Sequence, residues 1–431
     1  MKSRPGQGLI EISKKIRHMQ NDHASRRTPP RPDTRREQHP LQHPSNPLPQ
    51  APTLLDPAVM PQQPQQEQPP ANGWLIDWCE RGRVPDALIR WGIRRLIKQR
   101  LRDEYINDGE ARSKRFNRFV DELRASPIAI ETQSANTQQY ELPAAFFAGH
   151  LGARLKYSCC LHRTGKETLD EAERAMLEEY TVRAQLTDGQ RVLDLGCGWG
   201  SLSLWLAEAY PASEIVALSN SLGQQKFIEG QAAARGIRNL TVVTGDIVDF
   251  QFDPAILGEG FDRVLSIEMF EHMKNYRLLL NKVSGWMRED AKLFVHVFAH
   301  RTLAYHFEAK DGTDWMSKYF FTGGTMPSEA LLLYFQDELT IDRQWWVSGA
   351  HYQKTANQWL DNLDAARKQL MPLLDQTYGP ADATIWFQRW RMFYMAVAEL
   401  FGYAGGNEWG VAHYRFSKRP VASAAPAAPV A

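Results

Sequence analysis

Residues 192–200 read Val192-Leu193-Asp194-Leu195-Gly196-Cys197-Gly198-Trp199-Gly200, and this stretch decides the fold. It completes a short apolar run that begins at Arg191, and it precedes an apolar helical pattern over Leu202–Tyr210. Glycines between a strand and a helix let the backbone turn tightly and approach a ligand closely. The stretch therefore predicts a ligand-binding loop at the carboxyl edge of a parallel sheet.

Strand and helix patterns alternate downstream of this loop. A helix is expected at Gln224–Arg235, and further strands are expected at Ile215–Leu218, Leu240–Val243, Phe261–Ser266 and Leu293–Val297. Such alternation is typical of βαβ units and a parallel sheet. The chain from Trp315 to Tyr403 is rich in aromatic residues and mostly helical in pattern. We therefore expect a helical insertion at about residues 302–395 that forms a cap.

The two ends of the chain differ in composition from its middle. Residues 1–72 are rich in Pro, Gln and Arg. Such a segment cannot bury enough apolar surface to offset its ordering entropy, so we expect it to be disordered. Residues 418–431 have the composition of a flexible Ala/Pro tail. Between these ends we expect a helical N-terminal region at residues 73–156 and the main domain at residues 157–417.

The helical N-terminal region contains a basic amphipathic helix from Leu88 to Arg102, in which apolar residues recur at helical spacing between arginines and lysines. One interpretation is a helix docked on the main domain with a solvated charged face. The other is contact with an anionic lipid surface, because basic amphipathic helices can lie in a membrane interface. A second helix is expected over Ser113–Leu123, and Ser126-Pro127 ends it.

Composition excludes several classes of protein. The chain has 431 residues and a net charge of +1, so no strong positive field indicates a nucleic-acid partner. Its four cysteines show no C-x-x-C spacing, which favours neither a disulfide framework nor a metal site and fits a reducing compartment. No apolar run reaches the roughly 18 residues that span a membrane, and no secretory signal is evident. We therefore expect a cytoplasmic protein.

The spacing of the glycines distinguishes two kinds of nucleotide site. A nicotinamide site requires G-x-G-x-x-G and an acidic residue after the second strand. Here Gly196, Gly198 and Gly200 alternate with other residues, and the second strand ends in the uncharged Ser219-Asn220-Ser221. This arrangement, with Asp194 upstream, resembles the loop with which class I methyltransferases bind S-adenosyl-L-methionine (SAM).

Longer blocks of sequence carry a more specific resemblance. They are Tyr140–Pro143, Tyr157–Cys160, Leu193–Gly200, Ser266–Tyr276, Tyr319–Ser328 and Val397–Tyr403. Residues 84–417 resemble the cyclopropane-fatty-acyl-phospholipid synthase superfamily of methyltransferases, and within it the coclaurine N-methyltransferase-like enzymes. The resemblance implies a Rossmann-like α/β fold with a seven-stranded, mostly parallel sheet and SAM as the cofactor. A homodimer is compatible with this reading.

The resemblance also implies which residues hold the cofactor. Tyr157 and Ser158 are expected to contact it from a lid segment. Core contacts are expected from Asp194, Gly196, Gly198, Gln224, Asp246 and Ile247. Asp246 follows the third strand, where the family commonly pairs an acidic residue with the adenine amino group and packs its apolar neighbour on the ring. A helix N-cap is the alternative role for Asp246.

The candidate catalytic residues are Glu268, Glu271 and His272, which follow the strand Phe261–Ser266. In a helical turn, residues three and four positions apart share one face. Two carboxylates and an imidazole on one face would bind an ammonium group and accept its proton, and histidine titrates near neutral pH. The alternative is an acidic cluster at a helix start, favoured by the helix dipole.

A second reaction class stays open. The lipid enzymes of the superfamily add a methylene to unsaturated phospholipid acyl chains and hold bicarbonate in a cage, whose counterparts here are Cys159, Glu271, His296 and Tyr352. Two departures favour a small amine as the methyl acceptor: Glu268 replaces a common glycine, and Phe298 replaces a common isoleucine. Aromatic residues that are candidates for the substrate wall are Phe320, Phe321, Trp346, Tyr352 and Tyr403.

Overall fold

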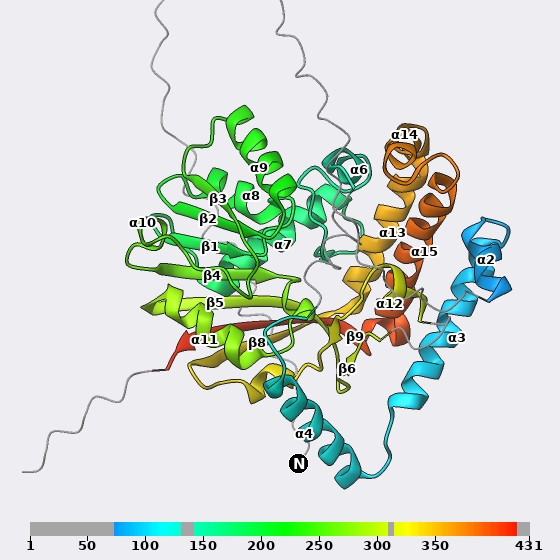
Figure 1. The fold of residues 1–431 in the computed structure, drawn as a ribbon, viewed down its shortest axis with the longest axis horizontal. Helices are drawn as coiled ribbons and strands as arrows, with labels where there is room; N and C mark the ends of the chain where they lie inside the picture. The colour runs from blue at the N-terminus through cyan, green and yellow to red at the C-terminus, as the bar shows by residue number, and fades with distance from the viewer. Residues whose placement is uncertain (1–72, 131–141, 309–313, 420–431) are drawn as a thin grey trace, which may run out of the picture. The chain divides into compact units, whose positions relative to one another are not determined.

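The computed structural model describes residues 73–130, 142–308 and 314–419. Its centre is a seven-stranded sheet in the order β3-β2-β1-β4-β5-β9-β8 (Figure 1). The first five strands of this order are parallel, and β9 runs antiparallel to both of its neighbours. The strands are β1 (Arg191–Leu195), β2 (Glu214–Ser219), β3 (Leu240–Thr244), β4 (Phe261–Ile267), β5 (Met287–His300), β8 (Leu339–Ser348) and β9 (Trp409–Lys418). The predicted fold class is confirmed.

Apolar side chains cover both faces of the central strands, because successive residues of a strand point to opposite faces. Leu265 and Phe294 belong to one buried cluster together with residues of α7 (Leu169–Ala184). Val264 and Val295 belong to the other, with residues of α11 (Tyr276–Trp286). Between the strands lie α8 (Ser201–Ala209), α9 (Leu222–Ala234), α10 (Pro254–Leu257) and η1 (Phe270–His272).

A helical layer stands beside the sheet (Figure 1). It contains α13 (Gly349–Ala365), α14 (Arg367–Tyr378) and α15 (Ala383–Phe401), with α2 (Trp74–Glu80) and α3 (Asp86–Glu104) packed along α15. Smaller elements complete the described chain: α4 (Gly109–Ala125), α6 (Ala144–Ala148), α12 (Trp315–Tyr319), β6 (Tyr305–His306), β7 (Thr325–Met326), η2 (Leu331–Tyr334) and η3 (Tyr403–Gly406).

The basic helix α3 docks on α15. Ile89 and Ile97 are buried, and both Arg90 and Arg94 form ion pairs with Glu399 of α15 at 3.0 and 2.7 Å. Part of the positive charge of this helix therefore serves packing within the fold. Its outer face still exposes apolar side chains, namely Leu88, Trp91 and Leu96.

Two expectations are corrected by the structure. The helical insertion at about residues 302–395 contains β8, which pairs with β9 as the edge of the main sheet. The many aromatic residues of this segment suit a strand as well as a helix, because aromatic side chains favour strands. Helix α4 begins at Gly109, four residues before the predicted start, because the Asp108 side chain caps it by accepting from Ala111 N at 2.6 Å.

Residues 1–72 and almost all of 418–431 lie outside the described residues, as do Tyr140 and Glu141 of one sequence block. The predicted domain limits at residues 72, 156 and 417 stay predictions. Among the helices of the described residues, none is both long enough and apolar enough to span a bilayer.

Candidate active site

The glycine loop joins β1 to α8 at the carboxyl edge of the sheet. Gly196, Gly198 and Gly200 all have positive φ, at 83°, 52° and 79°, and Gly200 is the N-cap of α8. A side chain at Gly196 would approach Cγ of Met269 within 2.9 Å. At Gly198 a Cβ would meet nothing within 4 Å, because this residue faces an open crevice. The loop therefore leaves room for a ligand at the position that the sequence predicts.

The crevice beside this loop, together with the open space at its mouth, has about 710 Å³ free of protein atoms. Its lining includes Gly196, Gly198, Gln224, Asp246 and Ile247, so the structure brings together five of the predicted cofactor residues. The Gln224 side chain accepts from Ser219 Oγ at 2.6 Å, yet its buried Nε2 has no partner among the described residues. An amide in this state is ready to donate to a ligand.

Asp194 lies beneath the loop rather than in the larger crevice. Its carboxylate is buried and accepts from Ser203 Oγ at 2.5 Å, and burial raises its pKa to about 7. It lines an adjoining pocket together with Tyr157 and Ser158, the predicted lid residues. All eight predicted cofactor residues therefore border two neighbouring cavities that share Gly196, Gly198 and Glu268.

Polar atoms in the adjoining pocket fit the amino-acid end of SAM. Ser201 Oγ and Trp199 Nε1 are buried and have no partner among the described residues. Ser201 is the first residue of α8, where the helix dipole favours an anionic group. A carboxylate beside this helix start could accept the unused hydrogen bonds, so these residues fit the predicted cofactor.

Glu268 occupies a strained position directly after β4. Its φ is +49°, in the left-handed region that residues other than glycine rarely adopt. Three groups hold its buried carboxylate. Cys159 N donates to Oε1 at 3.0 Å, the Tyr352 hydroxyl donates to Oε2 at 2.7 Å, and His296 Nε2 lies 3.0 Å from Oε1. The surrounding structure thus fixes both the backbone and the side chain.

This geometry bears on the predicted bicarbonate cage. Cys159, His296 and Tyr352 do converge on one point, but the carboxylate of Glu268 itself occupies that point. No hydrogen bond of the described residues joins Glu271, the fourth expected member, to this cluster. A carboxylate of the chain therefore stands where these three donors would otherwise receive a free anion.

Glu271 and His272 lie on the 3₁₀ turn η1, whereas Glu268 precedes that turn, so the expected single helical face does not exist. All three residues nevertheless border one pocket. Glu271 is buried, its Oε2 has no partner among the described residues, and burial, with the Glu268 charge second, raises its pKa well above the ordinary value. Burial lowers the pKa of His272 to about 4, and its ring stacks on Phe321.

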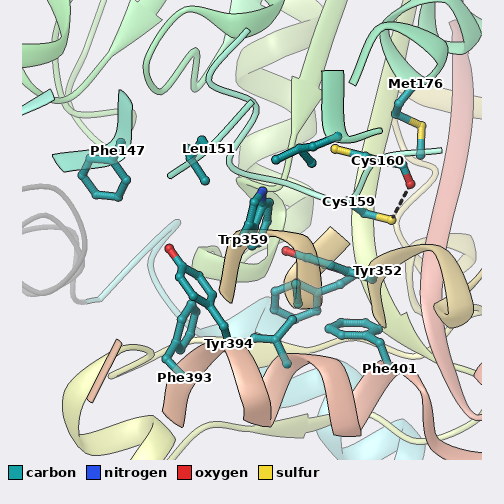
Figure 2. Packing of buried hydrophobic residues seen from close by; sticks show 14 of the residues in the cluster. Phe147, Leu151, Cys159, Cys160, Met176, Tyr352, Trp359, Phe393, Tyr394 and Phe401 are labelled. Carbon is teal, nitrogen blue, oxygen red and sulfur yellow. Dashed lines mark hydrogen bonds between the residues drawn. The ribbon is translucent and has the colours of Figure 1, made fainter. Parts of the chain in front are cut away.

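The pocket above these groups is aromatic and, together with the open space at its mouth, has about 650 Å³ free of protein atoms. Figure 2 shows Tyr352, Trp359, Phe393 and Phe401 gathered there, with Tyr352 and Phe401 stacked at 4.4 Å between ring centroids. The other lining aromatics are Tyr157, Phe298, Phe307 and Phe321. Of the expected wall residues, Phe321 and Tyr352 line the pocket, whereas Phe320, Trp346 and Tyr403 do not.

Comparison with known proteins places the chain in a family. Residues 129–401 match the family model described as mycolic acid cyclopropane synthetase. The chain belongs to the mycolic acid cyclopropane synthetase family. The relatives reported below are methyltransferases, and one of them was solved with S-adenosylhomocysteine bound, so the protein is a SAM-dependent methyltransferase.

Relatives within this family include enzymes named for amines and for lipids. (S)-coclaurine N-methyltransferase from Thalictrum flavum subsp. glaucum is 39% identical over 80% of this chain and 95% of its own. A cyclopropane-fatty-acyl-phospholipid synthase from Escherichia coli strain K12 is 29% identical over 53% of this chain and 56% of its own.

A solved coclaurine N-methyltransferase, bound to N-methylheliamine and S-adenosylhomocysteine, has a TM-score of 0.76 and 39% identity. It covers 80% of this chain and 99% of its own. A mycolic acid cyclopropane synthase at 22% identity and a TM-score of 0.56 shares the fold. The cofactor is therefore SAM, since the related methyltransferase was solved with the product formed from it.

Some residues near the site carried no signal in the sequence. His413 of β9 and Arg183 of α7 reach His296 through hydrogen bonds. His413 is far from the glycine loop along the chain, and only the antiparallel pairing of β5 with β9 brings it opposite His296.

Proposed function

We propose that this methyltransferase N-methylates a small amine that carries an aromatic ring. The observation that supports this proposal most is the buried Oε2 of Glu271, which has no partner among the described residues and borders an aromatic pocket. A buried carboxylate oxygen without a donor is costly unless a ligand satisfies it. An ammonium N–H would do so, and the aromatic faces around it attract cations and stack on flat rings.

The cofactor would be held by the residues of the two neighbouring cavities. Gln224 and Asp246 offer polar groups to the nucleoside, and the start of α8 with Ser201 offers donors to the amino-acid end. Bound SAM supplies an electrophilic methyl group on a sulfonium. The two cavities and the aromatic pocket share Glu268, which supports an acceptor nitrogen placed at this junction.

The chain must also remove a proton, because an amine is mostly protonated at neutral pH and only its lone pair can attack. Burial raises the pKa of Glu271, so its carboxylate is a stronger base than that of an ordinary glutamate. The pKa of His272 is lowered to about 4, so its ring is neutral and can accept a hydrogen bond from the amine. We assign proton acceptance to Glu271 and orientation of the nitrogen to His272, and Glu268 adds negative charge that attracts the ammonium group.

The lipid reaction is the alternative, and the geometry around Glu268 argues against it. A methylene addition to an alkene passes through a cation that must lose a proton to a base, and the resemblance to the lipid enzymes implies that bicarbonate held in a cage is this base. Here the three donors that would hold such an anion are already bound to Glu268. The relatives named for N-methylation, which this chain matches over most of their length, also support an amine.

Two smaller proposals accompany this function. A cytoplasmic location is supported by four cysteines that form no disulfide among the described residues. Contact with an anionic lipid surface is supported by the exposed Leu88, Trp91 and Leu96 on the basic helix α3. No observation supports or opposes a homodimer, which stays a prediction.

The proposal is tested by incubating the full chain and methyl-labelled SAM with a panel of primary and secondary amines, with and without an aromatic ring. Unsaturated phospholipid vesicles serve as the competing acceptor. We expect label in ring-bearing amines and none in lipid. Label in the lipid alone would contradict the proposal.

A further inference from the structure

A continuous chain of hydrogen bonds leads from Glu268 through two buried histidines to an arginine. His296 Nε2 lies 3.0 Å from Glu268 Oε1, and His296 Nδ1 lies 2.8 Å from His413 Nε2. His413 Nδ1 in turn lies 2.6 Å from Arg183 Nη1. His296 and His413 are cross-strand partners in the ladder between β5 and β9, and both are fully buried.

Arg183 decides where the proton of His413 lies. A guanidinium group has only donors, so Arg183 must donate to His413 Nδ1, which then carries a lone pair. A cationic His413 would place two N–H groups against each other across 2.6 Å. The ring is therefore neutral and carries its single proton on Nε2.

The same reasoning fixes the next ring. Only one proton fits between two nitrogens 2.8 Å apart, and His413 Nε2 already holds it. His296 Nδ1 is therefore an acceptor, and the Tyr180 hydroxyl lies 3.0 Å from the same nitrogen. The proton of His296 lies on Nε2 and points at the Glu268 carboxylate.

We propose that Arg183 and His413 are positioning residues of the active site, which hold His296 as the tautomer that donates to Glu268. With the other tautomer, a nitrogen lone pair would face the carboxylate oxygen across 3.0 Å, and Glu268 would have to take up a proton. A neutral Glu268 no longer attracts an ammonium group. The inference rests on the proposed function only for this last step, since the direction of the hydrogen bonds follows from Arg183 alone.

Other charged and titratable groups face the two rings. They are Lys156, Tyr180 and Arg183, with Glu268 at the far end. Burial is the main cause that lowers the pKa of both histidines well below the ordinary value; Lys156 is the next cause for His296, and His296 is the next cause for His413. Glu179 pairs with Arg183 at 2.8 Å and neutralises part of its charge. These surroundings keep both rings neutral over the working range of pH.

The test compares variants that remove the donor with variants that keep it. Arg183→Met and His413→Leu interrupt the chain of hydrogen bonds. Arg183→Lys keeps a cationic donor, and His413→Gln keeps one acceptor and one donor on the same side chain. Arg183→Met also loses the pair with Glu179, so loss of stability alone does not count as support.

The first readout is the ¹⁵N chemical shifts of the histidine rings in the full chain, which need no substrate. We expect His296 and His413 of the wild type to be neutral Nε2–H tautomers, and Arg183→Met to give mixed tautomers at His413. A cationic ring or an Nδ1–H tautomer at either histidine in the wild type would overturn the inference, even where no variant folds. That result would leave the proposed function standing.

The second readout is the pH profile of kcat/KM for the amine. Arg183→Met and His413→Leu should lower kcat/KM on the order of 10–100-fold, as loss of an orienting partner does, with SAM affinity unchanged. The acidic limb of the profile should move to higher pH, and Arg183→Lys and His413→Gln should restore it. Unmoved profiles in both interrupted variants would reject the positioning role. Correct tautomers without any methylated amine would instead reject the proposed function.

Discussion

The Tyr352 hydroxyl donates a hydrogen bond of 2.7 Å to Oε2 of Glu268, and this contact joins helix α13 to the end of strand β4. Tyr352 also stacks on Phe401 of α15, so the acid is tied to two helices that line the aromatic pocket. The same contacts therefore fix both the orientation of the Glu268 carboxylate and the position of the aromatic pocket wall. Residues on both sides of this contact are open to direct tests.

Glu268→Gly should empty the anion position and leave its three donors unsatisfied. We expect methylation of the amine to fall on the order of 10–100-fold, because a charged partner of the ammonium group is lost. Added formate or bicarbonate should restore part of the activity by occupying the vacated position. Glu268→Gln, which fills the same volume, is the matched control and should not respond. A Glu268→Gly enzyme that is fully active without added anion would show that this carboxylate has no role.

Glu271→Gln removes the assigned proton acceptor with little change in shape. The rate with an amine should fall on the order of 10²–10⁴-fold near neutral pH. The deficit should shrink at higher pH, where more of the amine is already free, and calorimetry should show unchanged SAM binding. His272→Ala serves as the comparison. It should raise KM for the amine and leave the pH dependence of the rate close to that of the wild type. If the rate deficit of His272→Ala shrinks at higher pH and that of Glu271→Gln does not, His272 is the proton acceptor and Glu271 orients the nitrogen.

Gly198→Val should abolish SAM binding, because a side chain there enters the crevice and the residue has a positive φ. Gly236→Val is the matched control. Gly236 also has a positive φ, at 69°, and open space around a Cβ, but it follows α9 and lies outside the crevice. We expect both variants to lose some thermal stability and only Gly198→Val to lose SAM affinity. Equal affinities in isothermal titration would mean that the loop does not face the cofactor.

Asp194 links the stability of the cofactor-free enzyme to pH. Its folded pKa, about 7, exceeds the ordinary 3.8, so folding favours the protonated form. The resulting penalty is absent below pH 4 and grows as the pH rises to about 7, towards roughly 4 kcal/mol. Asp194→Asn should therefore gain stability relative to the wild type at pH 8 and little at pH 4. Thermal melts at both pH values measure this, and a larger gain at pH 4 would contradict the raised pKa of the Asp194 carboxyl group.

The sequence predicted the sheet well where short strands alternate with helices. The run Arg191–Leu195 matches β1 at both ends, because buried parallel strands are mostly apolar and glycine follows this one directly. The prediction was wrong at β8, where aromatic residues suit an edge strand as well as a helix. That segment is recognised as a strand only through its pairing with β9, a contact distant in sequence.

In the candidate site, too, local sequence predicted some features, whereas others depend on contacts between distant residues. Motif spacing brought residues of the crevice beside the glycine loop together, since they follow successive strands and must meet at one edge of the sheet. It could not show that Glu268 has positive φ and turns its carboxylate into the cluster of Cys159, His296 and Tyr352. Motif spacing also could not show which of Glu271 and His272 is the stronger base, because their pKa values depend on burial.

The most direct test of methyl transfer to an amine uses SAM whose methyl group carries three deuterons. The full chain is incubated with this cofactor, a ring-bearing secondary amine and unsaturated phospholipid vesicles, and the masses of the products are measured by mass spectrometry. Because the lone pair attacks without loss of a methyl proton, the amine should carry all three deuterons and the lipid none. A lipid product that retains two deuterons, with the amine unchanged, would contradict the account.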